Sequence, residues 1–229
     1  MIAALRPCSF VDWPGRLAAV AFTQGCNLAC RYCHNPALVP RGAAGAAGAV
    51  PEGEVLRLLA ARRGRLDGLV VTGGEPTLHA GLAPLLRRVK ALGLGVKLDT
   101  NGTRPAAVAA LLAEGLVDYL AIDLKATPAR AGWLTGAARQ AAGARRCLAL
   151  ALRAGVDHEV RTTLAAPVHD ERQVEALARW AAGARRWALQ RFRPGGHLDP
   201  ASGLAPPAPA LLDAARAAAG AAGLAVVVR

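Results

Sequence analysis

Lysine and aromatic residues are scarce in this chain of 229 residues. Arginine supplies all but three of the 28 basic residues, and aromatic residues make up only 4% of the chain. Proteins that bind nucleic acids usually combine a basic patch with aromatic side chains, and this sequence shows no such interleaving, so we expect no nucleic-acid partner. The formal charge of +12 bears on association with an acidic partner more than on the fold.

Long hydrophobic runs are absent as well. No run reaches the length of a transmembrane helix, and Pro7 and Asp12 interrupt the N-terminal region before the apolar core of a signal peptide can form. We therefore expect a cytoplasmic protein with no membrane contact, in which thiols stay reduced. The length and the 53% of hydrophobic residues fit a single domain over residues 1–229.

Three of the five cysteines lie close together, because Cys26, Cys30 and Cys33 have the spacing C-x3-C-x2-C. A structural zinc ion takes four protein ligands, and a ferredoxin-type cluster takes four thiolates. The other two cysteines have no partner at ligand spacing. The triplet therefore predicts a cubane cluster with one open iron, or alternatively a zinc ion with His34 as its fourth ligand.

Short aliphatic runs alternate with helical stretches rich in Ala, Leu and Arg. This alternation predicts an α/β protein with a parallel sheet, and the number of βα units suits a partial (β/α)6 barrel. The core then covers about residues 11–194, followed by a loop, a helix and a possible last strand within residues 195–229. We expect strands near residues 18–23, 68–72, 95–99, 119–124, 158–163, 186–191 and 224–228. We expect helices over residues 52–63, 81–92, 105–114, 136–154, 171–182 and 208–222, and loops over residues 40–51 and 194–209.

Unusual polar residues follow the predicted strands, at their carboxyl ends. In an α/β barrel the active site is assembled at those ends. One or two such placements arise by chance, but here all six predicted core strands carry one, which predicts a single functional site. The residues concerned are Thr23 to Cys33, Gly73 to Pro76, Asp99 to Gly102, Asp123 with Lys125, Arg161 with Thr163, and Gln190 to Arg193.

The C-x3-C-x2-C loop resembles the cluster loop of the radical S-adenosylmethionine (SAM) superfamily. The resemblance implies a [4Fe-4S] cluster on Cys26, Cys30 and Cys33, with SAM chelated to the open iron through its amino and carboxylate groups. It further implies that an electron from the reduced cluster cleaves SAM into methionine and a 5′-deoxyadenosyl radical. The cofactors then carry the chemistry, and no side chain need act as an acid or a base.

The run TGGEP at residues 72–76 resembles the GGEP motif of that superfamily. Two glycines let the backbone approach a ligand closely. The resemblance implies that Gly73, Gly74 and the carboxylate of Glu75 hold the positive amino group of the methionine moiety.

The runs DTNG at residues 99–102 and IDLK at residues 122–125 resemble the matching strand ends of glycyl-radical-enzyme activases. The resemblance implies contacts with the ribose and carboxylate region of SAM, and Lys125 pairs with the SAM carboxylate. The residues implied are Asp99, Thr100, Asn101, Asp123 and Lys125. Some relatives bind a monovalent cation beside SAM, for which the donors here are Asp99, Thr100, Asp123 and the carbonyl of Ala121.

Five further residues match positions that contact a ligand in these relatives. Arg161 and Arg193 occupy strand ends that contact SAM or substrate, and an Arg fork suits a carboxylate or a ribose hydroxyl. Tyr32 occupies the place of a residue that lies over the adenine. Two segments, VDWPG and CHNP, resemble activase segments that face the peptide substrate, so Asp12 and His34 are candidate contacts with the partner.

The motifs together are most similar to those of anaerobic ribonucleoside-triphosphate reductase activating proteins with a single cluster. The resemblance implies a glycyl-radical enzyme as partner and a flavodoxin- or ferredoxin-type reductant. In the formate-lyase branch a His stands where this chain has Arg193. Three alternatives remain: an activase of pyruvate formate-lyase or another glycyl-radical enzyme, a small-molecule enzyme similar to carboxy-deazaguanine synthases, and a non-catalytic zinc-binding adaptor.

Overall fold

The computed structural model describes residues 1–40 and 48–229 of the chain. These residues form two compact units. The first unit consists of residues 1–27, 37–40, 48–100 and 106–120, and the second of residues 28–36, 101–105 and 121–229. Of the predicted loop at residues 40–51, residues 41–47 lie outside the described residues.

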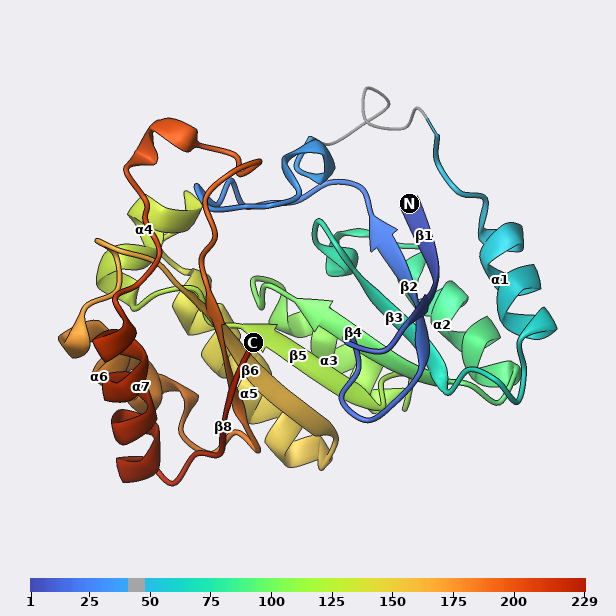
Figure 1. Cartoon of the computed structure of the whole chain (residues 1–229). Helices are drawn as coiled ribbons and strands as arrows, with labels where there is room; N and C mark the ends of the chain where they lie inside the picture. The colour runs from blue at the N-terminus through green and yellow to red at the C-terminus, as the bar shows by residue number, and fades with distance from the viewer. Residues whose placement is uncertain (41–47) are drawn as a thin grey trace. The chain divides into compact units, whose positions relative to one another are not determined.

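The first unit is built on strands that follow one another in chain order (Figure 1). They are β1 (Ile2–Ser9), β2 (Ala18–Thr23), β3 (Gly68–Gly73), β4 (Gly95–Thr100) and the first residues of β5 (Tyr119–Asp123). Strand β1 runs antiparallel to β2, whereas β2, β3 and β4 are parallel. The helices are α1 (Glu52–Ala61), α2 (Leu82–Ala91) and α3 (Pro105–Ala113).

The apolar pattern explains these elements. Residues 18–21 of β2 and residues 69–71 of β3 are fully buried, as is typical of parallel strands that are covered on both faces. Helix α2 buries Leu82, Leu85, Leu86 and Val89, which is the spacing of one helix face. Trp13, from the loop between β1 and β2, is 2% exposed and lies against Gly68 and Gly95, where a β-carbon would meet its ring.

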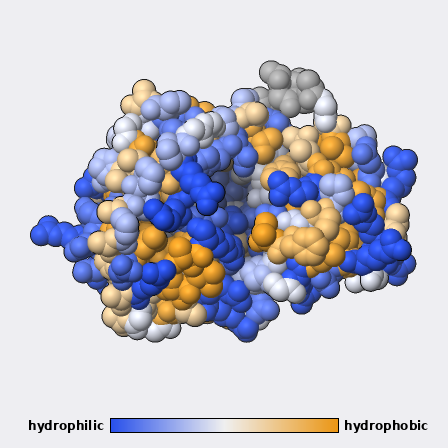
Figure 2. Space-filling view, viewed as in Figure 1, coloured by the Kyte–Doolittle hydropathy of each residue, from blue (hydrophilic) through white to orange (hydrophobic). Residues whose placement is uncertain are grey.

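The second unit begins with the last residues of β5 and continues with β6, β7 and β8. Its elements are α4 (Pro128–Thr135), α5 (Gln140–Ala154), β6 (Asp157–Leu164), α6 (Glu171–Ala181), β7 (Trp187–Arg191), α7 (Pro209–Ala221) and β8 (Val226–Val228). Strands β6, β7 and β8 are parallel and adjacent in that order. Helices α6 and α7 lie side by side (Figure 1). In Figure 2 hydrophobic residues gather at the surface over β8, where Val227 is 39% exposed.

The predicted strands and most predicted helices are confirmed within a few residues. Two elements were missed. Strand β1 contains Arg6 and Pro7, which break the apolar pattern, and Pro is tolerated where a strand needs no donor at that position. Helix α4 was not predicted, although Pro128 stands at its start, where a missing N–H costs nothing. Within the described residues, each helix is either too short or too polar to cross a membrane.

Candidate functional site

Apart from Asp12, the predicted site residues lie at or after the carboxyl ends of the strands. The strands β2, β3, β4, β5 and β7 end at Thr23, Gly73, Thr100, Asp123 and Arg191. Arg161 and Thr163 lie in the last residues of β6, which ends at Leu164. The first unit holds Asp12, Cys26, Gly73 to Glu75, Asp99 and Thr100. The second unit holds the other predicted site residues.

In the first unit, the chain packs tightly against the two glycines of the GGEP turn. The Gly74 and Glu75 N–H groups donate to the carbonyls of Thr23 and Gly25, both at 2.9 Å. A β-carbon on Gly74 would lie 2.1 Å from the Gly25 oxygen, and one on Gly73, whose φ is +112°, would lie 2.4 Å from the Thr23 nitrogen. The segment that leads into Cys26 therefore passes too close to Gly73 and Gly74 to leave room for a β-carbon. This alone requires glycine at both positions, with or without a ligand.

Glu75 is fully buried and joins the ends of β3 and β4. Its Oε1 accepts hydrogen bonds from the Thr100 hydroxyl at 2.8 Å and from the backbone N–H of Thr77 at 3.1 Å. The second bond caps the short turn at Pro76–Leu78. Two predicted site residues, Glu75 and Thr100, are thus brought together, and the carboxylate is held in one orientation.

Asp99 forms a buried ion pair with Lys97 in the same strand, β4. The Lys97 side chain is 1% exposed, and its Nζ also lies 5.7 Å from the centre of the Tyr119 ring. Sequence reasoning missed Lys97, although residues two apart on a strand share a face. The charge of Asp99 therefore has a fixed partner within the chain, with which the predicted monovalent cation would compete.

Asp12 lies between β1 and β2, at the amino end of β2, whereas Cys26 follows the carboxyl end of that strand. Its carboxylate accepts a hydrogen bond from the Ser9 hydroxyl at 2.5 Å and lies 3.5 Å from the Arg6 guanidinium. These contacts order the turn in which Asp12 stands. The contact of Asp12 with a partner stays a prediction, and it would be made at the other end of β2 from the Cys26 loop.

In the second unit, the main chain around Cys30 and Cys33 is fixed from two sides. On one side, the N–H groups of Ala29 and Arg31 donate to carbonyls of the last turn of α4, those of Thr135 at 3.1 Å and Leu134 at 3.0 Å. These carbonyls have no partner inside a helix, so the cysteine loop also completes the C-terminus of α4.

On the other side, residues that follow β7 bind the same loop. The N–H groups of Leu198 and Asp199 donate to the carbonyls of Cys33 and Arg31, at 2.9 and 3.0 Å. Arg31 joins the two sides, because its guanidinium pairs with Asp199 at 2.5 Å and stacks at 4.6 Å on the ring of Trp133 in α4. We call this arrangement, residues 192–199 bound to residues 30–34, the loop clamp.

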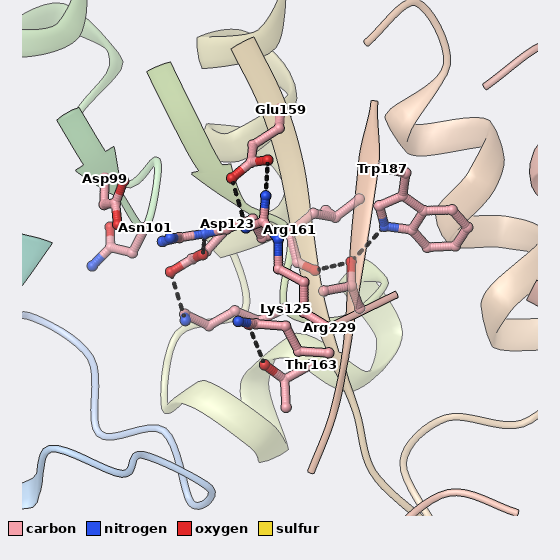
Figure 3. A network of polar contacts seen from close by, with 12 residues as sticks. Asp99, Asn101, Asp123, Lys125, Glu159, Arg161, Thr163, Trp187 and Arg229 are labelled. Carbon is pink, nitrogen blue, oxygen red and sulfur yellow. Dashed lines mark hydrogen bonds and ion pairs between the residues drawn. The ribbon is translucent and has the colours of Figure 1, made fainter. Parts of the chain in front are cut away.

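A cluster of charges lies at the ends of β5 and β6 in the second unit (Figure 3). The Asp123 carboxylate accepts one hydrogen bond from Lys125 Nζ at 3.0 Å and another from Arg161 Nε at 2.9 Å. Lys125 Nζ also lies 5.7 Å from the centre of the Tyr32 ring. Four predicted site residues, Tyr32, Asp123, Lys125 and Arg161, are therefore brought together.

The pKa values of this cluster follow from burial and from the ion pairs. Burial alone would raise the pKa of Asp123, but Arg161 and Lys125 outweigh it and lower that pKa to about 2. Burial would lower the pKa of Lys125, whereas Asp123 raises it well above its ordinary value. Burial raises the pKa of the Tyr32 phenol, which therefore stays neutral. The cluster thus presents two fixed cations and one carboxylate at neutral pH.

His34 and Arg193 line a cavity of about 310 Å³ near the ends of β6 and β7, together with Thr163, Gln190, Arg191, Pro194 and Gly195. The Nε2–H of His34 donates to the Arg193 carbonyl at 2.8 Å. Next to it, Phe192 packs edge-on against His197, with ring centres 5.1 Å apart. His34 and Arg193 are thus neighbours, although 159 residues separate them in the sequence.

The donor chemistry of the cysteine loop fits an iron–sulfur cluster. All five cysteines lie among the described residues, and none is in a disulfide. Residues 1–40 and 48–229 contain no group of three or more His, Cys, Asp or Glu placed to hold a metal ion. In a cubane each thiolate binds a different iron, so its ligands need not converge on one point as ligands of a single ion do.

Sequence reasoning missed three further residues of the second unit: Arg31, Gln140 and His169. Gln140 is fully buried at the start of α5 and donates to the carbonyls of Asn101 at 2.7 Å and Asp123 at 2.6 Å. His169 is 3% exposed and contacts the carbonyl of Lys125 at 3.0 Å. No motif marks Gln140 and His169, because they act on the main chain of the motifs from elements distant in the sequence. Arg31 lies within the cysteine motif, but its partner Asp199 is 168 residues away.

Comparison with known proteins identifies relatives over most of the chain. The profile of the Radical SAM superfamily matches residues 20–181. A protein of Methanocaldococcus jannaschii, described as the glycyl-radical enzyme activating enzyme MJ1227, is 30% identical over 199 residues, which is 85% of this chain and 80% of that protein. The 7-carboxy-7-deazaguanine synthase of Rhodospirillum rubrum is 39% identical over 90 residues, which is 39% of this chain and 35% of that enzyme.

A solved structure shows the same fold. The crystal structure of a radical SAM methyltransferase from Sphaerobacter thermophilus matches with a TM-score of 0.74, covers 97% of this chain and 68% of that one, and is 21% identical in sequence. The predicted fold class, an α/β protein with the partial (β/α)6 arrangement, is thereby confirmed.

Proposed function

Because this chain belongs to the radical SAM superfamily, whose members use a [4Fe-4S] cluster and SAM, we propose that it activates a glycyl-radical enzyme, and that this partner is an anaerobic ribonucleoside-triphosphate reductase. The observation that carries the proposal is the match to an activating enzyme over 85% of the chain. The match to the deazaguanine synthase stops at 39% of the chain.

In this proposal Cys26, Cys30 and Cys33 hold the cluster, whose chemistry when bound is one-electron cleavage of SAM followed by removal of a hydrogen atom from a glycine of the partner. The chain itself binds and orients SAM. Glu75 offers a buried carboxyl group, held in one orientation and suited to the SAM amino group, and Lys125 carries a fixed positive charge suited to the SAM carboxylate. Both groups are buried or half-buried, where electrostatic interactions are stronger than in water.

The other predicted contacts complete this proposal. Gly73, Gly74, Asn101, Arg161 and Arg193 contact SAM or the substrate, and Tyr32 lies over the adenine. His34 faces the peptide of the partner, and a monovalent cation beside SAM is an optional addition. The electron comes from a flavodoxin- or ferredoxin-type protein in the cytoplasm.

The choice of partner rests on one departure from the formate-lyase branch, the Arg at position 193. Arg193 lines the same cavity as His34. This shared cavity supports the proposal that both residues contact the substrate. An activase of pyruvate formate-lyase is the second candidate, because it shares the other motifs.

The test is anaerobic reconstitution with iron and sulfide, reduction in the presence of SAM, and incubation with each purified glycyl-radical enzyme. We expect 5′-deoxyadenosine together with the electron paramagnetic resonance doublet of a glycyl radical on the ribonucleotide reductase. Cys30→Ala should abolish both signals, whereas Cys8→Ala, which removes a half-buried cysteine of β1, should abolish neither.

Other outcomes point to the alternatives. A doublet on pyruvate formate-lyase alone identifies the second candidate. SAM cleavage with no glycyl radical on any partner would favour a small-molecule substrate. A colourless protein that contains zinc after anaerobic purification would overturn the proposal in favour of an adaptor.

A further inference from the structure

The segment of residues 123–125, at the end of β5, is held by side chains from outside the IDLK motif that contains it. Three consecutive carbonyls in this segment each accept a hydrogen bond from a buried side chain of another element. The pairs are Asp123 with Gln140 at 2.6 Å, Leu124 with Thr162 at 2.8 Å, and Lys125 with His169 at 3.0 Å. Buried backbone carbonyls need a hydrogen-bond partner, and here side chains from α5, from β6 and from the loop before α6 supply three in a row.

The tautomer of His169 follows from its two neighbours. Nδ1 lies 3.0 Å from the Ala165 nitrogen and 3.2 Å from the Ala165 carbonyl oxygen. The backbone N–H can only donate, and the carbonyl already accepts from the His169 N–H at 2.9 Å, so we assign Nδ1 as the acceptor and place the ring proton on Nε2. Nε2–H then donates to the Lys125 carbonyl. Burial lowers the pKa of His169, which favours this neutral form. His169 therefore supplies one directed donor to the main chain of Lys125.

The side-chain amide of Gln140 makes three hydrogen bonds, two to the segment of residues 123–125 and one to Asn101 after β4. Its two N–H groups donate to the carbonyls of Asp123 and Asn101, and its Oε1 accepts from the Lys125 N–H at 3.4 Å. The main chain of Lys125 is thus bound on its nitrogen side by Gln140 and on its oxygen side by His169.

From these contacts we infer that Gln140 and His169 are positioning residues, which fix the main chain of Lys125 so that its ammonium group faces the carboxylate of SAM. The inference rests on the proposed function, because it takes Lys125 as a SAM contact. The Lys125 ammonium is held 3.0 Å from Asp123 and 5.7 Å from the centre of the Tyr32 ring. A shift of the main chain would therefore stretch these contacts or force the side chain into another rotamer.

The first measurement is made on the cluster-free protein. The chain contains only three lysines, Lys90, Lys97 and Lys125, so protein labelled with ¹⁵N-lysine gives three Nζ signals by nuclear magnetic resonance. We expect His169→Phe and Gln140→Leu to shift the signal of Lys125, while the signals of Lys90 and Lys97 stay in place as internal controls. His169→Gln keeps a donor near the position of Nε2 and should restore the original signal.

The second measurement is the dissociation constant of SAM for the reconstituted protein. We expect His169→Phe to raise it by about tenfold, the size of one lost hydrogen bond, and His169→Gln to leave it near the wild-type value. His158→Phe is the matched control, because His158 is also 3% exposed and makes two hydrogen bonds, to Val156 and Arg185. It should destabilise the fold without changing the Lys125 signal or the affinity for SAM.

The outcomes separate this inference from the proposed function. If Lys125→Met weakens SAM binding but His169→Phe and Gln140→Leu change neither the Lys125 signal nor the affinity, the positioning roles are wrong and the proposed function stands. If Lys125→Met binds SAM as the wild type does, the inference fails at its premise. If one of the two positioning variants does not fold, the other decides the question.

Discussion

At the scale of single residues, the second unit keeps its buried charges in pairs. Glu159 is fully buried in β6, and both of its carboxylate oxygens accept hydrogen bonds from Arg229, at 3.1 and 2.8 Å (Figure 3). A bidentate pair of this kind fixes both partners in one geometry. The last residue of the chain is therefore bound to a strand in the interior.

Removing one partner of this pair should destabilise the protein. We expect Arg229→Ala to lower the free energy of unfolding by about 3 kcal/mol, because it leaves the Glu159 carboxylate buried and unpaired. Glu159→Gln added to that variant should recover part of the loss. Arg216→Ala breaks an exposed pair with Asp213 and should change stability by less than about 1 kcal/mol. Urea denaturation measures all three, and equal losses for Arg229→Ala and Arg216→Ala would contradict the argument.

Histidine titration gives a second prediction at this scale. Burial lowers the pKa of His169 and outweighs the hydrogen bond to the Lys125 carbonyl, which raises it. Histidines of the unfolded chain take up protons near pH 6.5, whereas folded His169 takes up its proton only at lower pH. Stability should therefore be full above about pH 6.5 and should fall as the pH drops below it.

The measurement is urea denaturation of the wild type and His169→Gln between pH 8 and pH 5. The fall should be shallower in the variant. Part of it should remain in both proteins, because burial also lowers the pKa of His79. Asp123, whose pKa is lowered to about 2, loses its contribution only below about pH 4, outside this range. Parallel curves for the two proteins would refute the role of His169.

At the scale of elements, the turn after β3 depends on the absence of a side chain. Gly74→Ala would place a β-carbon 2.1 Å from the Gly25 oxygen, which is backbone and has little freedom to move. We expect a loss of about 2 to 4 kcal/mol in the free energy of unfolding. Gly53→Ala is the control, because Gly53 lies in the first turn of α1 with nothing near its β-carbon position. Alanine should leave the stability unchanged there or raise it by less than about 1 kcal/mol. If the Gly74→Ala protein is as stable as the wild type, the segment that leads into Cys26 can move enough to accommodate the added methyl group, which would contradict this prediction.

The sequence predicted the motif residues at the strand ends, but not the side chains that hold those strand ends in place. The alternation of aliphatic and helical stretches predicted the six core strands, and the motif residues then fell at their carboxyl ends. Strand β1 could not be predicted, because its pairing with β2 overrides a sequence that contains Arg6 and Pro7. The supports of the site were also out of reach, because Gln140 and His169 bind main-chain atoms, which leave no mark on the sequence of the segment that they hold.

At the scale of the whole molecule, the net charge of +12 should act on encounter rather than on folding. We expect the association rate with an acidic protein, such as a flavodoxin, to fall steeply as ionic strength rises, while the dissociation rate changes much less. Stopped-flow measurements at increasing salt test this, with a basic protein of similar size as control. An association rate that does not depend on salt would show that the arginines are too dispersed to steer a partner.

The loop clamp also constrains when the protein can mature in the cell. Arg31 and Asp199, which pair in the clamp, are separated by 168 residues. At ordinary rates of translation, the ribosome needs roughly ten to thirty seconds to add that stretch. The cysteine loop thus leaves the ribosome long before the residues that shape its far side, and it can reach its final form only after Asp199 has been synthesised.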